Sequence, residues 1–137
     1  MARRLCESTF MKLRISGNSI RFRLSQSDVR RLLDTGSIEE SASFGANPEN
    51  RFSYALLFAP MAAETGAAFS NSRLTVEIPK DKGIEWAASE AVGIESVQRI
   101  SGAGDMKILI EKDFACRSSK RRDEDSDAFP NPVVEQC

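Results

Sequence analysis

The sequence contains no histidine. This absence excludes Ser-His and Cys-His nucleophile pairs, an imidazole general base and any zinc site with a histidine ligand. The Gly-x-Gly-x-x-Gly and Gly-Lys-Ser/Thr patterns of phosphate-binding loops are missing as well. Most familiar hydrolase mechanisms are therefore excluded, and a nucleotide would have to bind without a recognisable phosphate loop.

Long apolar runs and a charge imbalance are also absent. No stretch approaches the ~20 apolar residues that cross a bilayer, and the opening MARRLCESTF lacks the apolar region of a secretory signal. The formal net charge of -1 gives no general attraction to nucleic acid or to an anionic membrane. We therefore expect a cytoplasmic protein with no membrane partner, and the charge balance disfavours nucleic acid.

The length of the chain predicts one domain. A domain of 137 residues buries roughly two thirds of its unfolded surface, so it needs neither a metal nor a disulfide to fold. The sequence predicts no cofactor.

Alternating and helical patterns predict the elements. The stretch MKLRISGNSIRFRL alternates apolar and basic residues around Gly17-Asn18, which predicts a β-hairpin. Ser25 and Asp28 form a capping-box pattern before a short helix that Gly36 ends. A second helix is expected from Asp81, with four residues on its packed face: Ile84, Ala87, Ala88 and Ala91. Five further strands are predicted, at residues 38–45, 51–59, 69–79, 94–100 and 106–114.

The order of these elements predicts an α+β fold. Short connections favour antiparallel neighbours, so we expect a single curved, mainly antiparallel sheet of about six to seven strands with two short helices. This domain covers residues 11–115. Residues 1–10 are expected to be an N-terminal extension, either disordered or a misassigned start. Residues 116–137 are expected to form an irregular C-terminal tail docked on the domain.

The predicted hairpin is strongly basic. Its two-residue loop places Lys12 opposite Arg23 and Arg14 opposite Arg21, and each like-charged pair destabilises a sheet by up to ~1 kcal/mol. Acids on adjoining strands can relieve this repulsion, and the candidates are Glu39, Glu77 and Glu111. Alternatively, a phosphate or carboxylate ligand binds over Lys12, Arg14, Arg21 and Arg23, because convergent guanidinium groups match such anions.

The tail carries a partial metal-binding pattern. Asp123, Asp125 and Asp127 have the spacing that opens a calcium-binding EF-hand loop. The central glycine is replaced by Ala128, and the closing glutamate falls one residue late. These aspartates and Cys116 are therefore weak metal candidates, and a solvated acid run is the alternative interpretation.

Two cysteines bracket the tail. A disulfide between Cys116 and Cys137 would contribute roughly 3 kcal/mol, whereas a reducing compartment would keep both as free thiols. They are the candidate redox residues. Phe129 and Pro130 are the candidate tail anchor, because an aromatic ring can fill a groove and proline stiffens the chain.

Four stretches carry a resemblance to a known family. MKLRISGNSIRFRLSQSDV, RFSYAL, EWAASEAVGIE, and EKDFACR with EDSDAFPNP together resemble a family of small uncharacterised bacterial proteins, a domain of unknown function. The resemblance covers Met11 to Cys137. It implies that residues 1–10 are peripheral and that the tail belongs to the domain, and it implies no activity.

These observations favour a binding or accessory domain over an enzyme. We expect it to engage a small anionic ligand or a protein partner through the basic hairpin. Two alternatives remain: a redox- or metal-responsive protein that uses the tail, and a carboxylate-based enzyme of unknown reaction. In the enzyme hypothesis, Glu111 and Asp113 are the candidate acid and base.

Overall fold

The computed structural model describes residues 11–114 and 129. It contains eight strands, two α-helices and one short 3-10 helix, in this chain order: β1 (Lys12–Ser16), β2 (Ser19–Leu24), α1 (Gln26–Thr35), β3 (Ser37–Ser43), η2 (Pro48–Asn50), β4 (Arg51–Ala59), β5 (Gly66–Ser70), β6 (Arg73–Pro79), α2 (Lys80–Ala88), β7 (Gly93–Ile100) and β8 (Gly104–Lys112).

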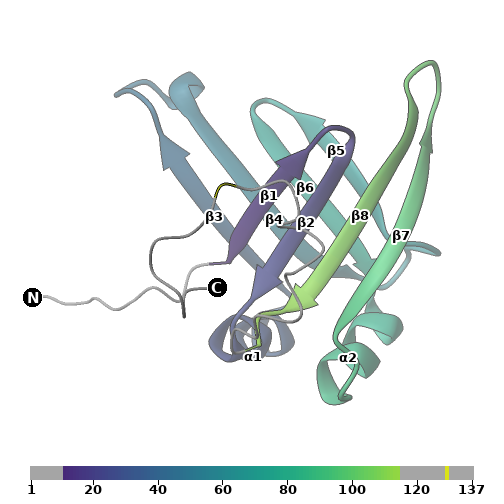
Figure 1. Ribbon diagram of the computed structural model, residues 1–137. Helices are drawn as coiled ribbons and strands as arrows, with labels where there is room; N and C mark the ends of the chain where they lie inside the picture. The colour runs from purple at the N-terminus through teal and green to yellow at the C-terminus, as the bar shows by residue number, and fades with distance from the viewer. Residues whose placement is uncertain (1–10, 115–128, 130–137) are drawn as a thin grey trace, which may run out of the picture.

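The strands form two four-stranded sheets that lie face to face, with both helices at one end (Figure 1). The strand orders are β1-β2-β8-β7 and β3-β4-β6-β5. Each sheet joins two antiparallel hairpins through a central parallel pair, β2 with β8 and β4 with β6. Apolar side chains from both sheets and both helices form one core, which includes Phe22, Ile110, Leu56, Val76 and Trp86.

The α+β class with two helices is confirmed, but the predicted single, mainly antiparallel sheet of about six to seven strands is wrong. The described residues hold eight strands in two mixed sheets. Each helix carries the chain from one sheet to the other, so the hairpins before and after a helix lie in different sheets. The parallel pairs connect segments far apart in the sequence, and no local pattern predicts them.

Strand β5 was not predicted from the sequence, because the residues of the β5–β6 turn were assigned to a strand. Residues 69–79 were expected to be continuous, but β5 and β6 form a hairpin around Asn71 and Ser72. Both turn residues adopt positive φ, at 52° and 60°, a conformation that asparagine tolerates better than most residues. The short β5, which consists mostly of small residues, resembles a loop in sequence.

Helix α1 follows its sequence prediction. The Ser25 hydroxyl accepts a hydrogen bond from the backbone N–H of Asp28 at 3.1 Å, and the Asp28 carboxylate accepts one from the Ser25 N–H at 2.9 Å. Gly36 ends the helix in the left-handed conformation. The buried Asp28 also accepts a hydrogen bond from Arg31 at 2.8 Å, so the capping carboxylate has partners for both oxygens.

Helix α2 packs differently from the prediction. It begins at Lys80, without a side-chain cap, and buries Gly83 and Trp86. Ile84 is 40% exposed, and Ala88 and Ala91 are exposed as well. The large indole of Trp86 decides which face turns inward, because burying it removes more apolar surface from water than burying an isoleucine.

The described chain is built from two halves with the same order of elements. β1-β2-α1-β3-β4 is followed by β5-β6-α2-β7-β8, and exchanging the halves converts one sheet order into the other. The register agrees. Ser19 pairs with Lys107 in one sheet and Arg73 pairs with Ser53 in the other, and positions 19 and 73, like 53 and 107, differ by 54. The halves are therefore related by an approximate twofold.

Backbone hydrogen bonds outside the sheets repeat in the same way. The N–H of Phe58 donates to Gly36 O and that of Lys112 donates to Val92 O, both at 2.9 Å. In each case the chain segment after a helix caps the end of a central strand. Phe58 and Lys112 therefore occupy equivalent positions in the two halves.

A glutamine side chain connects the edge strands β5 and β7 of the two sheets. Gln98 of β7 accepts a hydrogen bond from Ala67 N–H of β5 at 2.6 Å and donates one to Ala67 O at 3.1 Å. Its amide thereby mimics a strand partner. The equivalent residue in β3 is Ala42, which cannot make these bonds. At that side Tyr54 donates its hydroxyl to Met11 O at 3.0 Å.

Gly83 lets α2 lie close to β4. A Cβ added at this residue would overlap the ring of the buried Phe58. Alanine normally stabilises a helix interior by up to ~1 kcal/mol relative to glycine. Here we expect Gly83→Ala to lower the free energy of unfolding instead, by about 1–2 kcal/mol, because overpacking outweighs propensity. Urea denaturation measures the change.

Two controls sharpen this test. Gly66→Ala meets no atom closer than 3.6 Å and should change stability little. Phe58→Leu combined with Gly83→Ala should cost less than the two single changes added together, because the smaller side chain makes room for the Cβ. A stabilised Gly83→Ala variant would contradict the close packing.

Candidate functional site

The basic hairpin has the predicted register. Lys12 lies opposite Arg23 and Arg14 opposite Arg21. These four residues, which we call the basic hairpin face, line a hollow of about 170 Å³ together with Leu13. The apolar residues of β2 point into the core, so strand alternation places the cations on the outer face of their sheet. The structure thus brings all four predicted anion-binding residues to one place.

Acids from the end of β8 approach this face. Parallel pairing places Glu111 beside Arg23, and its Oε1 lies 3.6 Å from Arg23 Nε and 3.9 Å from Arg21 Nε. Asp113 Oδ2 lies 3.3 Å from Lys12 Nζ. Of the acids predicted to relieve the cationic repulsion, Glu111 does so.

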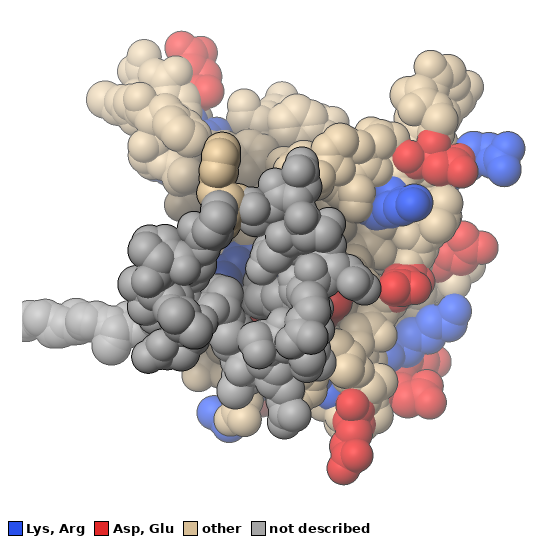
Figure 2. Space-filling view, viewed as in Figure 1, with Lys and Arg blue, Asp and Glu red and all other residues tan. Residues whose placement is uncertain are grey.

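The other two predicted acids belong to the second sheet. Glu39 forms an ion pair with Arg73, and Glu77 lies on β6. The expectation that they interleave with the basic hairpin is wrong, because it assumed a single sheet. The four hairpin cations lie on the outer face of the first sheet at β1 and β2, whereas charges of both signs interleave over β7 and β8 (Figure 2).

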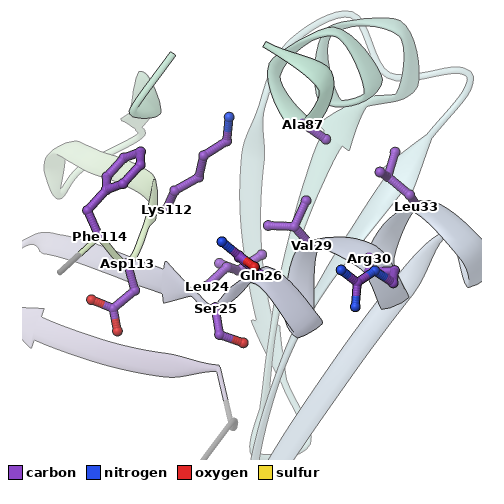
Figure 3. Close-up of a pocket in the computed structure, with 10 residues that line it drawn as sticks. All are labelled: Leu24, Ser25, Gln26, Val29, Arg30, Leu33, Ala87, Lys112, Asp113 and Phe114. Carbon is purple, nitrogen blue, oxygen red and sulfur yellow. The ribbon is translucent and has the colours of Figure 1, made fainter. Parts of the chain in front are cut away.

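A larger cavity lies at the helical end of the molecule (Figure 3). This helix-end pocket has a volume of about 440 Å³ and lies between α1, α2 and the chain just after β8. Its lining is Leu24, Ser25, Gln26, Val29, Arg30, Leu33, Ala87, Lys112, Asp113 and Phe114. Sequence reasoning missed it because three segments distant in sequence form it. The sequence offered one hint, because its helical pattern places Leu33 on the apolar face of α1. In the structure this side chain is 43% exposed at the pocket.

The candidate catalytic carboxylates do not share a cavity. Glu111 is held by Arg21 and Arg23, while Asp113 lines the helix-end pocket and pairs with Lys12. An acid and a base that act on one substrate must both reach it. This arrangement gives the carboxylate-enzyme hypothesis no geometric support.

A third hollow, of about 460 Å³, is acidic. It is lined by Glu39, Glu40, Ser41 and Tyr54. Burial raises the pKa of Tyr54, and the nearby carboxylates of Glu40 and Asp28 raise it further. The phenol therefore stays protonated at neutral pH and can donate its hydrogen bond to Met11 O. Within residues 11–114 and 129, no three Cys, Asp or Glu side chains gather as metal ligands would.

The predicted tail sites lie outside the described residues. This applies to the metal candidates Asp123, Asp125 and Asp127, to Cys116 and Cys137, and to Pro130. Phe129 is described and is 95% exposed, which gives no support to its filling a groove. Docking of the tail and its metal or redox chemistry stay predictions.

The fold and the basic hairpin define a two-sheet α+β domain with a small cationic hollow on one sheet. The chain belongs to a family of unknown function, DUF7009, whose model matches residues 11–133. The match starts where the resemblance placed the beginning of the domain and includes most of the tail. No curated protein and no solved structure matches the chain significantly. In the described part, neither helix has the length and apolar character to span a membrane.

Glu111 should stabilise the basic hairpin by relieving its repulsion. We expect Glu111→Gln to lower the free energy of unfolding by about 1 kcal/mol at low salt, and by less at 1 M salt, because screening weakens both the lost attraction and the remaining repulsion. Denaturation at the two salt concentrations measures the effect. Glu95→Gln removes the same charge from β7, opposite Leu109, and is the control. Equal losses in both variants would argue against a specific role for Glu111.

Proposed function

We propose that this protein is a non-catalytic binding domain that holds a small anionic ligand, or an acidic group of a partner protein, on the basic hairpin face. The observation that carries the proposal is the convergence of Lys12, Arg14, Arg21 and Arg23 on one hollow. Three guanidinium groups offer planar forks of donors that match phosphate and carboxylate oxygens.

The energetics of the hairpin support this role. Two like-charged cross-strand pairs carry a cost that a sheet with only a structural role could avoid by placing uncharged residues there. Glu111 and Asp113 offset part of the cost. A bound anion would offset more, and the hairpin would then supply a preorganised site, because its register is fixed by core residues on the opposite face.

The net charge of -1 favours a discrete anion over an extended polyanion. Nucleic acid binding draws on many phosphate contacts and on a broad basic surface. Here charges of both signs interleave on the neighbouring strands (Figure 2). The site therefore suits a ligand of one or two phosphate or carboxylate groups.

Thermal denaturation with pyrophosphate, inorganic phosphate and citrate tests the proposal. A ligand at about 100 times its Kd stabilises a protein by ~2.7 kcal/mol, which corresponds to a rise of several degrees in Tm for a domain of this size. We expect at least one anion to raise Tm relative to sodium chloride at the same ionic strength. Arg14→Glu with Arg21→Glu should abolish the rise.

The matched control is Arg99→Glu with Lys107→Glu, which reverses the same charge on β7 and β8 but outside the hollow. It should keep the response. If the reversed hairpin does not fold, Lys12→Gln with Arg14→Gln provides a milder test on exposed side chains. The proposal fails if no anion stabilises the wild type beyond sodium chloride, or if the control loses the response equally.

A further inference from the structure

The helix-end pocket has an equivalent in the second half of the chain, and there the space is filled. Phe58 at the end of β4 pairs with Ile78 of β6, and its ring packs directly against Gly83 of α2. The ring is buried. In that half, an aromatic side chain therefore fills the space between the strand end and the helix.

In the first half, different residues stand at the positions equivalent to Phe58 and Gly83. Lys112 pairs with Leu24 at the position equivalent to Phe58, and Val29 stands where Gly83 stands. The Lys112 ammonium turns toward α2 (Figure 3), donates to Ser89 O at 2.5 Å and lies 5.4 Å from the centre of the Trp86 ring. Val29 takes part of the vacated space. Leu24, Val29 and Lys112 all line the pocket of about 440 Å³, so the pocket includes the region that the Phe58 ring fills in the second half.

The lining of this pocket combines apolar walls with cations. Leu24, Val29, Leu33, Ala87 and Phe114 supply the apolar surface, as in most small-molecule sites.

Cationic groups and one acid complete the lining. Arg30 forms no ion pair with any residue in 11–114 or 129. The one acid, Asp113, pairs with Lys12, and its carboxylate points away from Val29 (Figure 3). Because Asp113 is neutralised in this way, the cations Arg30 and Lys112 set the charge of the lining.

We propose that the helix-end pocket binds a small aromatic carboxylate. Its ring would pack on Val29, Leu33 and Ala87, in the region that the Phe58 ring fills in the second half. Its carboxylate would bond to the Arg30 guanidinium, which offers paired donors at the rim. This site is separate from the basic hairpin face, and its ligand need not be the one bound there.

The test is titration of 3-phenylpropionate into the ¹⁵N-labelled full chain, followed through backbone amide shifts. We expect saturating shifts at Val29, Arg30 and Ala87. The neutral 3-phenylpropanamide should bind at least about tenfold more weakly, because it cannot form the charge-assisted bond. Arg30→Gln should remove this preference for the acid, since the side chain is exposed and outside the core.

Filling the pocket should block binding. Ala87→Leu, and independently Lys112→Phe, which restores the residue of the other half, should each weaken 3-phenylpropionate at least tenfold. Ala68→Leu on the exposed part of β5 adds the same side chain elsewhere and should leave the affinity unchanged. The proposal is overturned by equal affinities for the acid and the amide, by unchanged binding in both filled variants, or by shifts that do not saturate at these residues up to roughly 20 mM.

Discussion

The exchange of strands between two halves of the chain is the constraint on which the structure depends. Each half contributes one hairpin to each sheet, and the parallel pairs β2–β8 and β4–β6 join the halves at the centre of both sheets. Within one half, each central strand pairs only with its hairpin partner and lacks its parallel neighbour on the other side. The core and the helix-end pocket exist only when the halves are combined, because both take residues from each half. The basic hairpin face lies within the first half, and the second half supplies Glu111 and Asp113 beside it.

The approximate twofold also shows at which positions the two halves differ. Several core positions stay apolar in both halves: Leu24 corresponds to Ile78, and Leu32 of α1 corresponds to Trp86 of α2. Equivalent surface and rim positions diverge. Arg23 stands where Glu77 stands, so the cationic outer face belongs to one sheet alone. Such divergence is possible because outward residues of a sheet can change without disturbing the packing beneath them.

Sequence reasoning succeeded where a few neighbouring residues determine the structure. The register of the first hairpin and the capping box of α1 follow from spacing alone, and they placed the four hairpin cations correctly. It failed where distant segments decide. The parallel pairs, the second sheet and the helix-end pocket depend on contacts between positions such as Leu24 and Lys112, which no local periodicity reports. The twofold was hidden because related positions conserve apolar character and spacing more than identity.

The pairing of β2 with β8 bears on how the chain acquires its structure during synthesis. The second sheet needs nothing beyond β6, so it can assemble once residue 79 has left the ribosome. The first sheet lacks its central partner until β8 emerges, and contacts of such long sequence separation form slowly. Until then β2 has a free edge, and the apolar face of β1 and β2 is uncovered. Both can associate with other chains. The cations on the outer face of this hairpin give every nascent copy the same local charge. Their mutual repulsion would oppose association between copies until β8 has been synthesised.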